Sequence, residues 1–183
     1  VRSILTSLLK SHDSVLNDES FNTLIKEVES IINSRPLAIE NVGDPDSDLL
    51  TPNHLLTLKS KAVLPPPGVF QKEGVYCRRR WRTVQHLTNE FWNQWRKQYL
   101  ANLHTRQKWT TVKRNLEIGD IVLLKEENVP RNSWPVARIT KTFPNDDGLV
   151  RSVEIVVSSK LQTKLKTLKR PISKLVMICE ASN

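Results

Sequence analysis

RRRWRTVQHLTNEFWNQWRKQYLANLHTRQKW, residues 78–109, contains four of the five tryptophans, eight lysines and arginines, and one acidic residue, Glu90. Apolar side chains recur every three or four residues, as in an amphipathic helix. Because residues 75–117 contain neither proline nor glycine, we expect one long helix here. Its apolar stripe is predicted to comprise Trp81, Val84, Leu87, Phe91, Trp95, Tyr99 and Leu103, with Arg78, Arg79, Arg82, Arg96, Lys97 and Lys108 on the opposite, basic face.

The net charge of +9 is concentrated after residue 59. Residues 1–59 hold five basic and nine acidic side chains, a balance of −4, whereas residues 60–183 hold 23 and ten, a balance of +13. So basic a segment favours a polyanion, either nucleic acid or an anionic membrane surface. No apolar run reaches the length of a membrane span and the N-terminus lacks a signal-peptide pattern, so we expect an intracellular, soluble protein.

The acidic first part is predicted to be helical. Apolar residues of 4–9 share one helical face, and the same spacing recurs in residues 21–32. Asp18 is a candidate N-cap for the second helix, and Pro36 should end it. A third, short helix is expected after Thr51, which would cap it ahead of a proline in the first turn.

Three consecutive prolines at residues 65–67 predict an extended connection, and we place a linker at residues 60–74. The helices of residues 1–59 are too few for a domain, so we expect them to be the end of a domain that begins before Val1. The long helix would then occupy residues 75–114. On this division, residues 60–183 should fold without the first 59.

From Leu116 onward the apolar period changes to two, which predicts strands. Short strands with tight turns favour a small barrel over residues 115–183, because closure removes exposed sheet edges. SH3-like and OB-like barrels both fit this pattern, and the predicted fold class is α+β. The expected strands are residues 120–125, 136–143, 150–157, 165–168 and 175–178.

A series of motifs gives a resemblance to a known family. The chain resembles the integrases of Bel/Pao-type long-terminal-repeat retrotransposons along nearly its whole length, and departs from their pattern between Ser158 and Lys169. The resemblance implies that residues 1–59 are the last helices of a ribonuclease-H-like catalytic core, and that the barrel is SH3-like. The motifs are NSRPL (33–37), LTPNHLL (50–56), FWNQWRKQYLANLHTRQKW (91–109), LEIGDIVLL (116–124), WPVARITKTFP (134–144), DGLVRSV (147–153) and RPISKLVMI (170–178).

In that family two aspartates and a glutamate hold the divalent metal, and the resemblance places all three before Val1. We therefore expect a non-catalytic portion without a cofactor, although the parent integrase would use magnesium. The acids at 44, 46 and 48 lack the glycine and terminal glutamate of a calcium loop and are interpreted as solvated turn residues. Neither the scattered His12, His54, His86 and His104 nor Cys77 and Cys179 have metal-ligand spacing.

The basic residues suit DNA, because phosphate contacts release counterions and bind without reading sequence. We expect the tryptophans to pack rather than to stack on bases. The predicted partners are DNA and other integrase subunits, with no membrane and no small-molecule ligand, and the predicted location is nuclear. The candidate DNA-binding residues are Arg2, Arg78, Arg79, Arg82, Arg96, Lys97, Lys113, Arg114, Lys125, Arg138, Lys141, Arg151, Arg170 and Lys174.

Two other functions stay open. A chromatin reader would need two or three aromatic side chains around a methylated lysine, and after residue 114 only Trp134 and Phe143 are available. A protein-interaction role in a host that has domesticated the element is the other.

Overall fold

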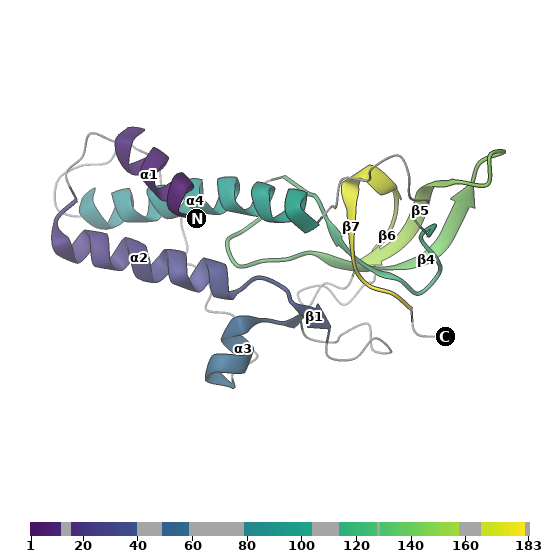
Figure 1. The fold of residues 1–183 in the computed structure, drawn as a ribbon, viewed down its shortest axis with the longest axis horizontal. Coiled ribbons are helices and arrows are strands. Elements are labelled where there is room, and N and C mark those ends of the chain that lie inside the picture. The colour runs from purple at the N-terminus through teal and green to yellow at the C-terminus, as the bar shows by residue number, and fades with distance from the viewer. Residues whose placement is uncertain are drawn as a thin grey trace.

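A computed structural model describes residues 1–11, 16–39, 49–58, 79–103, 114–127, 129–157 and 166–181. Helices occupy one end of the molecule and a sheet the other, and the longest helix runs from the helical end to the sheet (Figure 1). The helices are α1 (Arg2–Ser11), α2 (Asp18–Asn33), α3 (Pro52–Thr57) and α4 (Arg79–Leu103), with the 3-10 turn η1 (Ile172–Lys174). The strands are β1 (Ala38–Ile39), β2 (Leu49–Leu50), β3 (Ile121–Leu124), β4 (Val136–Pro144), β5 (Val150–Val157), β6 (Lys166–Pro171) and β7 (Leu175–Cys179).

Helix α4 confirms the long helix over its 25 described residues. Residues 75–78 and 104–113 of the predicted helix lie outside the described residues, and Arg114 is not helical. In the middle of the predicted stripe the apolar side chains are buried, but Trp81 and Leu103 near its ends are 46% and 39% exposed. A second stripe, offset by one position, is buried as well: Gln85, Thr88, Trp92, Arg96 and Leu100.

Two stripes are buried because α4 has neighbours on two sides. Helices α1 and α2 both pack on it, and β3, β7 and the β3–β4 loop contribute to the same hydrophobic core. The core contains residues from α1, such as Leu8, and from α2, such as Leu24 and Val28, all at most 4% exposed. This packing runs against the expected division of the chain, because the first helices share their core with α4.

The ends of the first helices follow local rules. Asn17 caps α2, with its side-chain oxygen accepting from the Ser20 N–H at 3.2 Å, so the predicted cap Asp18 is instead the first helical residue. Thr51 caps α3 as predicted, accepting from the His54 N–H at 3.2 Å. The pairing of β1 with β2 was not foreseen; Leu37 N–H donates to Leu50 O and extends it.

The five predicted strands are all present, in the antiparallel order β6-β5-β4-β3-β7. The fourth is shifted to Lys166–Pro171, compared with the expected 165–168. Strands β6 and β7 lie at opposite edges and η1 joins them, so the described residues form an open, five-stranded antiparallel sheet, and closure into a small barrel stays a prediction.

Strand β3 lies between two hydrophobic cores, and all four of its residues are buried. Leu123 belongs to the core shared with the helices. Val122 and Leu124 point to the other face of the sheet and belong to a second core with Ile139 and Ile155. An uninterrupted apolar run is therefore required here, because both faces of the strand are covered. Within the described ranges, no helix is both long and apolar enough to cross a membrane.

Candidate nucleic-acid interface

The loop between β3 and β4, residues 125–135, lies along α4. Trp92 donates its Nε1–H to the carbonyl of Val129 at 2.9 Å. Trp134, 8% exposed, packs edge-on against Trp92 with ring centroids 5.1 Å apart and against Trp95 at 5.9 Å. These aromatic contacts fasten the loop to the helix and confirm that Trp92 and Trp95 pack.

Tyr99 continues this aromatic cluster. Its ring stacks on Trp95 at 5.3 Å, and its hydroxyl donates to the carbonyl of Pro36 at 2.7 Å. Burial raises the pKa of the Tyr99 hydroxyl, and the charge of Arg35 opposes that rise. Trp134 is enclosed in this cluster, so its ring is not available to surround a methylated lysine, as a chromatin reader would require.

Arg96 is a correction to the sequence-based placement, which put it on the exposed basic face. Its side chain is buried, 7% exposed, with Nη1–H donating to Glu126 O at 2.6 Å and Nη2–H to Leu124 O at 3.0 Å. Burial lowers its pKa, and the charge of Glu126 opposes that effect. The second stripe of α4, with members three or four residues apart, is the signal that could have located it.

Arg131 is a second buried guanidinium, and it was missed altogether. It is 5% exposed, donates to the side chain of Gln85 on α4, and lies 3.5 Å from the carboxylate of Glu27 on α2. Burial lowers its pKa, while the charge of Glu27 opposes that shift. Next to it, Asn132 adopts a left-handed φ of 60° and accepts from the Ser34 hydroxyl at 3.1 Å. No periodicity in this loop indicated either contact.

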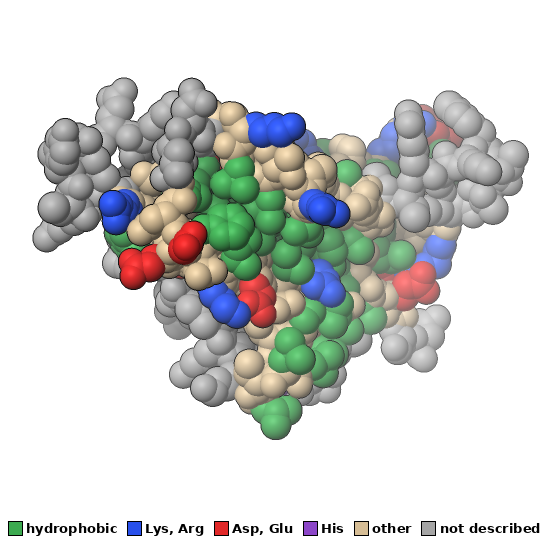
Figure 2. Space-filling view, turned by 60° about the vertical axis from the view of Figure 1, so that its left-hand side comes forward, with side chains coloured by type: hydrophobic (Ala, Val, Ile, Leu, Met, Phe, Trp, Pro, Cys, Tyr) green, Lys and Arg blue, Asp and Glu red, His purple; other side chains and the backbone are tan. Residues whose placement is uncertain are grey.

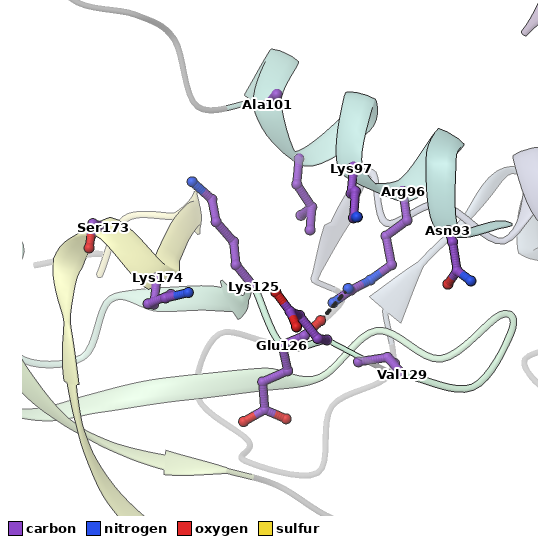
Figure 3. Close-up of a pocket in the computed structure, with 11 residues that line it drawn as sticks. Asn93, Arg96, Lys97, Ala101, Lys125, Glu126, Val129, Ser173 and Lys174 are labelled. Carbon is purple, nitrogen blue, oxygen red and sulfur yellow. Dashed lines mark hydrogen bonds between the residues drawn. The ribbon is translucent and has the colours of Figure 1, made fainter. Parts of the chain in front are cut away.

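A groove of about 570 Å³ opens where α4, the start of the β3–β4 loop and η1 meet (Figure 3). Lys97, Lys125 and Lys174, one from each of these segments, line it. The Lys125 N–H donates to Lys174 O at 2.9 Å, which holds these two residues side by side. Burial lowers the pKa of Lys125, and the charge of Lys174 lowers it further. The structure thus brings together three predicted DNA-binding lysines far apart in sequence.

Acidic neighbours partly neutralise three other candidates. Arg114 contacts Asp120 and Glu117 at 2.9 Å each and Glu180 at 3.8 Å, and its hydrogen bonds with Asp120 and then Glu117 raise its pKa. Arg151 pairs with Asp147, and Arg170 lies 3.5 Å from Glu126.

The remaining candidates are dispersed. Lys141 is exposed on β4, 5.4 Å from the ring of Phe143, which Lys169 also covers at 4.1 Å. Arg2 on α1 and Arg82 on α4 are exposed, and Arg138 on β4 is half-buried. Arg78 and Lys113 lie outside the described residues, and only the backbone of Arg79 is described.

Metal ligands do not gather in the part of the chain that the structure describes, where no three His, Cys, Asp or Glu side chains could hold one ion. The acids at 44, 46 and 48, together with His12, His104 and Cys77, lie outside it. His86 contacts Glu90 at 3.1 Å, and Cys179 is a free thiol.

The comparison with protein families gives one finding. Residues 79–178 match a family described as "Family of unknown function (DUF5641)". The matched region begins at the first residue of α4 and ends within β7, so it covers the helix, the groove and the sheet. No curated protein and no solved structure matches the chain.

Proposed function

The chain belongs to the DUF5641 family, and from that premise we propose that it is a non-catalytic, DNA-binding portion of a Bel/Pao-type retrotransposon integrase. It holds duplex DNA largely without sequence preference and supports assembly of integrase subunits in the nucleus. The motif order described above supports this identification. The proposed role requires no metal ion in this part of the protein, although the parent integrase would use magnesium.

The convergence of Lys97, Lys125 and Lys174 carries this proposal. None of the three forms an ion pair with a described carboxylate, unlike Arg114, Arg151 and Arg170. Lysines without an acidic partner can bind phosphates directly, and several of them along one groove suit a backbone of regularly spaced phosphates. Lys141 adds an exposed cation on the sheet.

The sheet topology supports the proposal that β3–β7 form an SH3-like barrel. The last strand, β7, pairs with the first, β3, and so brings the two ends of this segment together. A single 3-10 turn connects the edge strands β6 and β7, which a small barrel would place next to each other. We assign the helices of residues 1–59 to the end of a ribonuclease-H-like core on the resemblance alone.

DNA binding is tested by titrating the chain into labelled duplexes of two unrelated sequences over a range of salt concentrations. About four to six neutralised phosphates give a log-log slope near −4 to −5, with similar affinities for both sequences. Vesicles of anionic lipid serve as the comparison, because the aromatic cluster of α4 is buried and cannot enter lipid. Binding to vesicles but not to duplexes would contradict the proposal.

Absence of catalysis is tested separately. Purified, nuclease-free chain supplied with magnesium or manganese should neither cleave nor join DNA. Strand transfer by this chain alone would show that it carries its own catalytic centre.

An apolar surface supports the assembly role. Hydrophobic side chains spread from the middle of the helical face to its lower end (Figure 2), where α3 lies in Figure 1. On and next to α3, Leu55, Leu56 and Leu58 are 60%, 73% and 85% exposed. Sedimentation should show concentration-dependent association that Leu55→Glu with Leu56→Glu abolishes, and a monomeric parent chain would contradict this role.

A further inference from the structure

The groove beside α4 collects hydrogen-bond donors from three elements. Lys125 and Lys174 cannot separate without loss of the backbone hydrogen bond between them. Asn93 and Lys97 line the opposite wall from α4, and Ser173 lies beside Lys174 (Figure 3). The donors therefore face one space from helix, strand end and 3-10 turn.

Positive charge in this groove is not balanced within the described residues. Burial and the neighbouring Lys174 both disfavour the charged form of Lys125, and no described carboxylate pairs with either lysine. Glu126 and Glu127 also line the groove, and the carboxylate of Glu126 lies 3.5 Å from Arg170. The four lining cations, which include Arg96 and Lys97, still outnumber these two acids. An anion would relieve the repulsion between the two ammonium groups.

Arg96 supplies an independent indication. It is more than nine-tenths buried and lines the groove, and its Nε–H has no hydrogen-bond acceptor among the described residues. Its two terminal nitrogens already donate to Glu126 O and Leu124 O, so the guanidinium is held in place. The Arg96 guanidinium therefore adds a fixed positive charge with one unpaired donor to the wall of the groove, which favours an anion there.

We infer that this groove is a discrete binding site for a phosphate group, contacted by Lys125 and Lys174, with the Arg96 guanidinium in its wall. This inference deepens the proposed DNA binding and rests on it for the biological source of the phosphate. A phosphate suits the site because its oxygens point in several directions and can accept from all three elements at once. The groove's volume of about 570 Å³ leaves room for a nucleotide attached to that phosphate.

Inorganic phosphate is the first probe. The chain is titrated with phosphate at constant ionic strength while the lysine Nζ and arginine Nε resonances are followed by NMR. The expected result is saturable shifts of Lys125, Lys174 and Arg96, with affinity at least tenfold weaker in Lys125→Gln with Lys174→Gln. Lys166→Gln with Lys169→Gln removes the same charge from β6, where both lysines are exposed and neither lines the groove, and should leave phosphate affinity unchanged.

Equal weakening by both double variants, or no saturable shift in the parent chain, would overturn the site. Two further ligands distinguish the source of the phosphate. If the site holds a DNA backbone phosphate, a duplex displaces inorganic phosphate and loses affinity in the groove variant. If it holds a free nucleotide, deoxyadenosine monophosphate competes while a duplex does not. Phosphate binding without any duplex binding would retain this site and reject the proposed function.

Discussion

Two sets of cations on and next to α4 have different roles. Arg96 and Arg131 are at most 7% exposed and donate to the loop, to α2 or to α4 itself. Lys97, Lys125 and Lys174 line an open groove and have no described acidic partner. Formal charge in a sequence therefore overstates the charge available to a ligand, because part of it holds the fold together.

The division between arginine and lysine has a physical reason. A guanidinium is planar and weakly hydrated, and its several donors can satisfy two carbonyls at once, as Arg96 does with Glu126 and Leu124. An ammonium is compact and strongly hydrated, so the lysines remain at the open groove. The buried tryptophans and these two arginines thus belong to the packing of the molecule: Trp92, Trp95 and Trp134 with Arg96 and Arg131.

The largest expected effect is loss of the first helices. Without residues 1–58, the stripe of α4 that contacts α1 and α2 would face water, so the 59–183 fragment should lack the cooperative thermal transition of the full chain. Circular dichroism on both chains measures this. An equally cooperative fragment would restore the division at the proline-rich linker and show that α1 and α2 are dispensable.

Substitution of two tryptophans on α4 tests directly which side of the helix is buried. Trp92 is 2% exposed and hydrogen-bonded to Val129 O, whereas Trp81 is 46% exposed. Trp92→Ala should lower the free energy of unfolding by about 3–5 kcal/mol, and Trp81→Ala by under about 1 kcal/mol. Urea denaturation of the two variants gives the comparison, and similar losses would mean that the buried side of α4 is misplaced.

Neighbouring cations on α4 give a sharper contrast. Arg96→Met removes two charge-assisted hydrogen bonds and should cost about 2–3 kcal/mol of stability. Lys97→Met, on the exposed side, should change stability by less than about 0.5 kcal/mol but should weaken DNA binding. Denaturation and duplex titration are run on both variants. If Lys97→Met proves more destabilising than Arg96→Met, then Arg96 is not the structural cation and Lys97 is not the exposed, DNA-binding one.

The smallest effect concerns the protonation of Lys125. Its pKa should lie below the ordinary lysine value, because of burial and then Lys174, so Lys174→Gln should raise it. Since the folded-state pKa is lowered, the unfolded chain binds more protons between the two pKa values, and stability contributed by this group rises with pH across that window. NMR titration of the Nζ resonance reports the pKa of Lys125. An unchanged pKa in Lys174→Gln would mean that the charge of Lys174 does not act on Lys125.

Much of this architecture follows from periodicity. The change from a period near 3.6 to a period of two located α4 and the strands, and proline and threonine located the start of α3. Periodicity treats each helix as having one buried side, so it could not assign Arg96, whose position depends on carbonyls about 30 residues away. Arg131 depends on α2 and α4 together, and strand pairing likewise depends on which edges meet.

The groove shows the same limit. Lys97, Lys125 and Lys174 were each predicted as DNA contacts from charge and resemblance, but their proximity depends on how the β3–β4 loop and η1 pack beside α4. Arg114 and Arg170 looked equivalent to them in sequence, but both lie next to acids. Glu117 and Asp120 are close to Arg114 in sequence as well, whereas Glu126 reaches Arg170 only through the tertiary structure.

The salt dependence of duplex affinity tests the division between structural and binding cations most directly. The parent chain is compared with the triple variant Lys97→Gln, Lys125→Gln and Lys174→Gln, after denaturation has shown that both fold. If these lysines contact phosphates, the log-log slope becomes shallower by about two to three in the variant, because roughly 0.9 of a counterion is released per contact. An unchanged slope would contradict the account, because the groove would then not be where the DNA binds.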